Sequence, residues 1–126
     1  MEVRDIMRTE VETCGPEMTI ETVASMMKEF DLGSIPVLGD GELKGMITDR
    51  DIVIRGIASH FPMDTPIDLI MASDAPLMGT PIMSVEDAAD IMVKNRLRCL
   101  PIVEEGRVVG MLVLSDVTVD EDQETF

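Results

Sequence analysis

The sequence predicts an α+β protein built from two copies of one unit, related by a pseudo-twofold axis. Motifs recur along the chain at one offset of 65 residues, as from Gly45 to Gly110, and helical and strand patterns follow the same order in each copy. Half of a 126-residue chain is also too short to bury a sheet alone. We therefore expect the two copies to pack around one core.

The first copy begins with a short helical pattern over residues 3–8 and a brief extended stretch over 10–13. Thr19 is a suitable N-cap for a helix that runs to Phe30, with apolar residues spaced i, i+3, i+4 and i+7. A hairpin follows, with strands over 34–38 and 43–48 joined by an Asp-Gly turn. Residues 49–59 are predicted to form a second helix.

The second copy repeats this order. Residues 67–71 form the short helix, Ser84 opens the next helix with a capping box, and two strands lead to Asp116, which answers Asp51. We place the first repeat at residues 1–60, the second at 61–119 and an acidic tail at 120–126.

Composition excludes several functions. A net charge of −15 with no basic stripe argues against nucleic acid or anionic membranes as partners. No apolar run is long enough to span a membrane, and the N-terminus lacks a signal peptide's apolar core. Two cysteines without metal-site spacing fit a reduced, cytoplasmic protein.

No residue set indicates catalysis. His60 stands alone in a connector, and the sequence suggests no nucleophile–base pair or phosphate-binding loop. Asp49 and Asp51 could suggest a Mg²⁺ pair, but no further ligands accompany them, so no metal site is predicted. We expect a protein without catalytic residues that is not an enzyme and requires no cofactor.

The stretch from Gly45 to Asp51 is the strongest candidate for a binding site. A β-forming run ends in Thr48, Asp49, Arg50 and Asp51, and an apolar segment with helical spacing follows. Polar groups at such a junction suit a small ligand that carries hydroxyls and phosphate.

The duplicated pattern of apolar-Pro strand, Asp-Gly or Glu-Gly turn, and a glycine six residues before an aspartate resembles a tandem pair of CBS (cystathionine β-synthase-type) domains, as in small stand-alone CBS-pair proteins. The resemblance implies β-α-β-β-α repeats with sheets packed face to face, and a homodimer that forms a flat disc. It also implies clefts between the repeats for AMP, ADP, ATP or S-adenosylmethionine, and a regulatory role toward an effector protein. The alternative is a dimerisation or protein-interaction module with vestigial clefts that bind no ligand.

In the primary cleft, the resemblance implies that Asp51 accepts hydrogen bonds from a ribose diol while Thr48 and Arg50 face phosphate. A carboxylate suits a diol because two acceptor oxygens meet two donors. The opposite repeat would complete the cleft with Leu97, Arg98, Cys99, Ala75 and Leu77. Three structural alternatives stay open: Asp51 as a helix-start charge (a role Asp49 already suits), Thr48 as a plain strand residue, and Arg98 as a solvated helix-end cation.

A secondary cleft would use Ser115 and Asp116, together with Leu32, Gly33, Ser34, Glu10 and Val11. Val113 takes the place of Thr48, and neither Arg50 nor Arg98 has a basic counterpart. This cleft is therefore less suited to a phosphorylated ligand; it would stay empty or take a neutral or cationic adenosyl compound.

Overall fold

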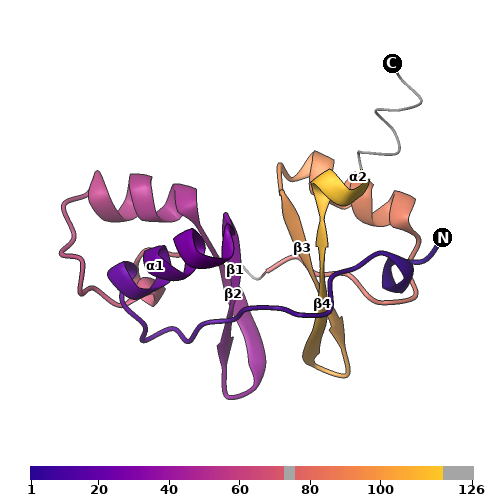
Figure 1. Cartoon of the computed structure of the whole chain (residues 1–126), viewed down its shortest axis with the longest axis horizontal. Helices are drawn as coiled ribbons and strands as arrows, with labels where there is room; N and C mark the ends of the chain where they lie inside the picture. The colour runs from indigo at the N-terminus through magenta and orange to yellow at the C-terminus, as the bar shows by residue number, and fades with distance from the viewer. Residues whose placement is uncertain (73–75, 118–126) are drawn as a thin grey trace. The chain divides into compact units, whose positions relative to one another are not determined.

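A computed structural model describes residues 1–72 and 76–117. The chain divides into two compact units, one of Glu12–Pro76 and the other of Met1–Val11 together with the chain from Leu77 onward. Each unit contains helices and a two-stranded antiparallel sheet (Figure 1). The predicted α+β class is therefore confirmed. None of the helices in the described ranges is long and apolar enough to cross a membrane.

The unit of Glu12–Pro76 follows the predicted order of helix, hairpin and helix. Thr19 caps its first helix as predicted, since its side chain accepts a hydrogen bond from the Thr22 N–H at 3.1 Å. Asp40 and Gly41 turn the hairpin with positive φ. The elements are α1 (Ile20–Phe30), β1 (Ser34–Gly39), β2 (Glu42–Thr48), η2 (Asp51–Ile57) and η3 (Ile67–Leu69).

The helix predicted over residues 49–59 has a different winding from an α-helix. Residues Asp51–Ile57 form a π-helix (η2), and beyond it Ala58 and Phe61 donate to the carbonyls of Val53 and Gly56, five residues back. Seven residues make about two turns or fewer in either winding, too few for apolar spacing to tell them apart. The sequence therefore indicated a helix here but not its type.

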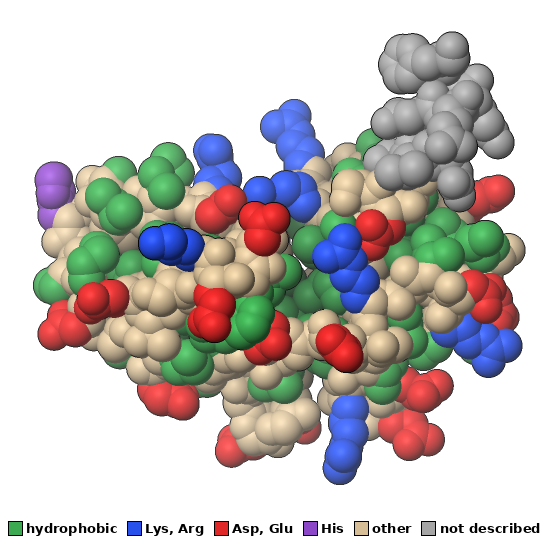
Figure 2. Space-filling view, in the orientation of Figure 1, with side chains coloured by type: hydrophobic (Ala, Val, Ile, Leu, Met, Phe, Trp, Pro, Cys, Tyr) green, Lys and Arg blue, Asp and Glu red, His purple; other side chains and the backbone are tan. Residues whose placement is uncertain are grey.

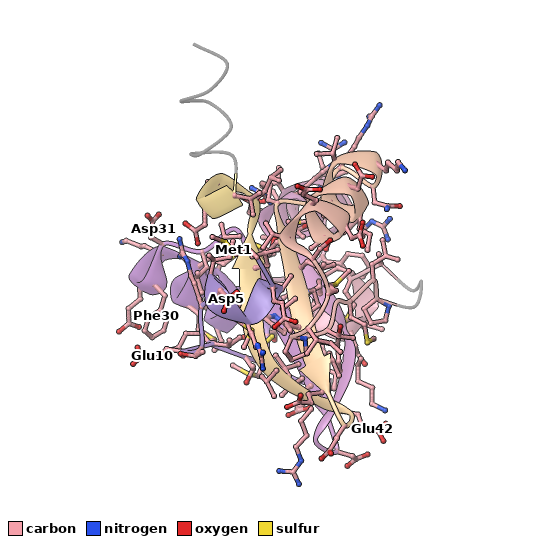
Figure 3. The ribbon with its side chains drawn as sticks, turned by 90° about the vertical axis from the view of Figure 1, so that its right-hand side faces the viewer. Met1, Asp5, Glu10, Phe30, Asp31 and Glu42 are labelled. Carbon is pink, nitrogen blue, oxygen red and sulfur yellow. The ribbon has the colours of Figure 1, made fainter. Side chains whose placement is uncertain are left out.

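The second unit repeats this architecture. Ser84 caps its long helix by accepting a hydrogen bond from the Asp87 N–H at 3.0 Å. The N-terminal segment, which carries Asp5 on a short 3₁₀-helix (Figure 3), belongs to this unit. The elements are η1 (Val3–Asp5), α2 (Val85–Lys94), β3 (Cys99–Glu104) and β4 (Arg107–Val113).

The two hairpins have the same register, displaced by 65 residues. Ser34 pairs with Thr48 in one sheet, and Cys99 pairs with Val113 in the other. The register shifts at Val37/Leu38 and again at Ile102/Val103, so even the bulge is duplicated. The internal repeat predicted from the sequence is thus present in the backbone pairing.

The leading segment of each predicted repeat, residues 3–8 and 67–71, packs with the hairpin and helix of the other repeat. Val3 is fully buried with α2, β3 and β4, although it opens the chain, and Ile67 is fully buried in the cluster that contains α1, β1 and β2. The described residues thus form a hydrophobic cluster in each unit, where the sequence suggested a single core. The repeat boundaries at 60 and 61 stay a prediction, because each compact unit combines parts of both repeats.

Two glycines lie against methionines of the leading segments. A Cβ on Gly110 would lie 2.5 Å from the Met7 sulfur and 3.0 Å from the Arg8 carbonyl oxygen. A Cβ on Gly45 would meet the terminal methyl of Met71 in the same way. Met7 and Met71 are 64 positions apart, whereas the glycines are 65 apart. The two leading segments therefore repeat with an offset of 64, one residue shorter than the offset of the hairpins.

Candidate functional site

Thr48 and Asp51 cap one another at the junction of β2 and η2. The Thr48 hydroxyl accepts a hydrogen bond from the Asp51 N–H at 3.1 Å, and Asp51 Oδ2 accepts one from the Thr48 N–H at 3.0 Å. This is the reciprocal geometry of a capping box, which satisfies two backbone donors at a helix start. From the sequence, the helix-start role was assigned to Asp49, but Asp51 takes part in it directly.

The Asp51 carboxylate is largely buried but keeps acceptor capacity. Its side chain is 14% exposed, and its Oδ1 lies 3.8 Å from Nε of Arg55, one helical turn further on. An ionised carboxylate can accept about four hydrogen bonds. Asp51 accepts one close hydrogen bond, from the Thr48 N–H to Oδ2. The structural role of Asp51 therefore does not use up its ability to accept from a ligand.

A shallow depression lies at the N-terminal end of η2, and Asp51 is not among the residues that line it. It has a volume of about 260 Å³ and is lined by Asp49, Arg50, Val53 and Ile54. Val53 and Ile54 are about half exposed, and hydrophobic side chains are visible over η2 at the upper left of Figure 2. The volume falls just below the ~300 Å³ at which small-molecule pockets usually begin. These residues offer a guanidinium, a carboxylate and an apolar wall to one side of a ligand.

The two junction stretches, Gly45–Asp51 and Gly110–Asp116, are the first and second motifs. The second motif has a different arrangement around its aspartate. Arg8 forms a bidentate ion pair with Asp116, with Nε 3.0 Å from Oδ2 and Nη2 3.1 Å from Oδ1. The hydrogen bond with Asp116 raises the pKa of Arg8 above its ordinary value. Val113 stands where the first motif has Thr48, so the second motif has no hydroxyl at that position.

Arg8 was absent from the residues assigned to either cleft. The sequence placed it in the first repeat, 108 residues from Asp116, and gave no sign that the N-terminal segment packs on the second unit. A signal existed in the comparison of the two leading segments. With their offset of 64, Arg8 corresponds to Ala72, so the segments differ in the residue that reaches the motif.

The loop before each hairpin accepts a backbone hydrogen bond from the motif in its own unit. The Asp49 N–H donates to the Gly33 carbonyl at 3.0 Å, and the Leu114 N–H donates to the Arg98 carbonyl at 2.8 Å. Ser34, assigned to the secondary cleft, lies directly opposite Thr48 in the sheet. The structure thus brings each pre-strand loop to the motif of the same repeat.

The remaining predicted residues are divided between the two units. Thr48, Arg50, Asp51, Leu32, Gly33 and Ser34 belong to the unit of Glu12–Pro76, and Glu10, Val11, Leu77, Leu97, Arg98, Cys99, Ser115 and Asp116 belong to the other. Ala75 lies outside the described residues. Glu10 is exposed and points away from the ribbon (Figure 3). That both sets gather around one ligand stays a prediction.

Metal ligands do not cluster in the described ranges. Within residues 1–72 and 76–117, no group of three or more His, Cys, Asp or Glu side chains is placed to hold a metal ion. His60, the single histidine of the sequence, is exposed in the turn that follows η2, where its φ is 65°.

Comparison with known proteins gives a consistent family. A family model for the CBS domain matches the chain twice, over residues 3–56 and 68–120. The CBS domain-containing protein YhcV of Bacillus subtilis is 42% identical over 119 residues, which cover 94% of this chain and 84% of that protein. Hypoxic response protein 1 of Mycobacterium tuberculosis is 34% identical over 115 residues, which cover 90% of this chain and 80% of that protein.

Solved structures share the fold over nearly the whole chain. The crystal structure of Hypoxic Response Protein I with two coordinated zinc ions has a TM-score of 0.83 at 32% identity and covers 95% of this chain and 98% of that chain. The CBS domain pair of protein MJ0100, in complex with 5′-methylthioadenosine and S-adenosyl-L-methionine, has a TM-score of 0.86 at 23% identity, with 98% of each chain covered. CBSX2 in complex with AMP has a TM-score of 0.81 at 21% identity, covering 99% of this chain and 98% of that chain.

Proposed function

This chain belongs to the CBS-domain family, and from that premise we propose that it is a non-catalytic regulatory module that binds an adenosine-containing ligand through Thr48, Arg50 and Asp51. The ligand would be AMP, ADP, ATP or S-adenosylmethionine. CBS-pair proteins generally act as regulatory modules. Two proteins of the same fold are in complex with such ligands, although their identities of 21% and 23% establish only the shared fold.

The observation that carries the proposal is the state of the Asp51 carboxylate. It is 14% exposed and held in place by the Thr48 N–H, and its Oδ1 has only a long, 3.8 Å contact with the flexible side chain of Arg55. A ribose diol presents two donors, and each hydrogen bond to a charged acceptor contributes about 1.5–3 kcal/mol. Two such bonds would supply about 3–6 kcal/mol, enough to fix the ribose in orientation.

Arg50 and the depression at the start of η2 would serve the rest of the ligand. A planar guanidinium can grip phosphate through two parallel hydrogen bonds, and Arg50 is exposed at the rim. The half-exposed side chains of Val53 and Ile54 provide apolar contact next to it. The Thr48 hydroxyl already accepts from the Asp51 N–H, but its own proton remains available to a phosphate oxygen.

Ligand-induced stabilisation tests the proposal. A ligand at 100 times its dissociation constant adds about 2.7 kcal/mol to the free energy of unfolding. For a chain of this size the melting temperature should rise by about 8–12 °C. We expect at least one of AMP, ADP, ATP and S-adenosylmethionine to give such a rise at millimolar concentration. If none shifts the melting temperature by more than about 2 °C, the sensor hypothesis is wrong.

A second function, in a different class, is supported by a specific observation. Both motif aspartates already have protein partners, Asp51 with Thr48 and Asp116 with Arg8, as would suit a module whose clefts bind no ligand. Such a module would act through dimerisation or protein interaction, and Val53, Ile54 and Ile57 are about half exposed on η2. Sedimentation of the chain with and without nucleotide separates the two: a ligand-free module would form the same dimer in both and show no melting shift.

The wider context of the protein follows from the same proposal. We expect a homodimer that forms a CBS disc, a cytoplasmic location, and an effector protein that responds to the ligated state. A net charge of −15 disfavours nucleic acid and anionic membranes as partners.

A further inference from the structure

The two motif aspartates differ in their closest charged partner. Arg55 approaches Asp51 through one contact of 3.8 Å between Nε and Oδ1. Arg8 contacts both oxygens of Asp116 at 3.0 and 3.1 Å, through Nε and Nη2. The second contact has the parallel, two-bond geometry in which a guanidinium matches a carboxylate.

A guanidinium held in this way competes directly with a ribose diol. A vicinal diol would also present two donors to the two oxygens of the carboxylate, so both groups require the same acceptor positions. Of the roughly four acceptor sites of the Asp116 carboxylate, Arg8 takes one on each oxygen, which is the pairing that a diol would use. Asp51 has one oxygen engaged by the backbone and the other only loosely contacted.

The position of Arg8 is fixed by its backbone as well as by its side chain. Arg8 and Met111 exchange two backbone hydrogen bonds, each of 2.8 Å, which hold the N-terminal segment on β4. The backbone of the N-terminal segment therefore positions the guanidinium next to Asp116, within the same compact unit. In the other leading segment, Ala72 takes the corresponding place and carries no charge that could reach Asp51.

We propose that Arg8 is the resident occupant of the second motif and holds Asp116 closed to a ribose diol, which limits the chain to one adenosyl site of useful affinity. This inference rests on the proposed function of Asp51, which supplies the open site for comparison. The two motifs therefore differ in two ways. The second motif has Val113 where the first has the hydroxyl of Thr48, and its carboxylate is paired with the guanidinium of Arg8.

The size of the effect follows from the exposure of the pair. The Arg8 and Asp116 side chains are 54% and 35% exposed, so solvent screens their attraction. The need to displace such a pair should weaken diol binding by up to about fivefold, the factor that corresponds to ~1 kcal/mol. Removing the guanidinium should therefore tighten binding at Asp116 by up to about fivefold.

The test is a titration of the full chain with AMP, followed by carbon-detected NMR of the Asp51 and Asp116 side-chain carboxyl signals. The variants are Arg8→Met, which keeps an apolar stem of similar length, and Arg8→Lys, which keeps the charge without the two-pronged geometry. Arg4→Met is the matched control, because Arg4 lies on the same segment but pairs with Glu2.

We expect the AMP dissociation constant read from the Asp116 signal to be lower in Arg8→Met than in the wild type, by up to about fivefold. The decrease should be smaller in Arg8→Lys and absent in Arg4→Met. The proposal is overturned if Asp116 responds equally in wild type and Arg8→Met, or if neither variant responds. A silent Asp51 signal in the wild type would refute the proposed function, and it is read separately from the change at Asp116.

Discussion

Replacing Asp51 with asparagine should separate its structural role from its role in binding. In Asp51→Asn the side-chain amide oxygen can still accept from the Thr48 N–H, so the capping box loses only the charge of one acceptor. We expect a loss of less than about 1 kcal/mol in the free energy of unfolding, or less than about 5 °C in melting temperature. Asp51→Ala removes the acceptor as well and should cost about 1–2 kcal/mol.

Binding should respond far more strongly than stability. An amide presents one acceptor oxygen and no charge, so a diol loses about 2–3 kcal/mol of charge-assisted hydrogen bonding in Asp51→Asn. The dissociation constant for AMP should therefore rise by about 30- to 150-fold. Isothermal titration calorimetry measures this constant, and thermal denaturation without ligand measures the stability of the same variant.

Asp116→Asn is the matched control for this experiment. It changes the equivalent residue of the other motif and removes the charge that pairs with Arg8, but it leaves the Thr48–Asp51 junction intact. We expect AMP binding by Asp116→Asn to stay within about twofold of the wild type. Wild-type affinity in Asp51→Asn, together with lost affinity in Asp116→Asn, would refute the assignment of the ribose to Asp51.

Three further predictions concern stability. Burial raises the pKa of the Cys14 thiol to about 11 from an ordinary value of 9.0. The thiol's contribution to the free energy of unfolding is therefore complete below about pH 9 and is lost as the pH rises through about 11. In chemical denaturation, the wild type should lose about 2–3 kcal/mol more than Cys14→Ala between about pH 8.5 and 11. Gly110→Ala should cost about 1–3 kcal/mol in urea denaturation, because its Cβ would press on the Arg8 carbonyl, whereas Gly45→Ala meets only a flexible methionine end and should cost less. Ser84→Ala should cost about 1 kcal/mol by removing the N-cap of α2, and an unchanged melting temperature would contradict that role.

Local features of the fold were accessible from the sequence because short-range chemistry determines them. Thr19 and Ser84 were predicted to cap their helices, and each accepts the expected N–H three residues on. The Asp40-Gly41 turn has the positive φ angles that its residues favour. The 65-residue repeat reappears in the pairing of both hairpins.

Features that depend on distant contacts were not accessible. Nothing in the order of residues 1–11 shows that this segment packs with α2, β3 and β4, since that choice is made by tertiary packing. The Arg8–Asp116 ion pair was missed for this reason. The role of Asp51 was only partly predicted, because a capping residue and a ligand-binding residue require the same side chain at the same junction.

The most direct test of the proposed site is a crystal structure of the chain grown with AMP. We predict nucleotide density at the junction of β2 and η2, with the ribose hydroxyls within hydrogen-bonding distance of the Asp51 carboxylate, about 2.5–3.2 Å. We also predict that Arg8 remains paired with Asp116 in the same crystal. Nucleotide bound at Asp116 with the Asp51 junction empty would contradict both predictions.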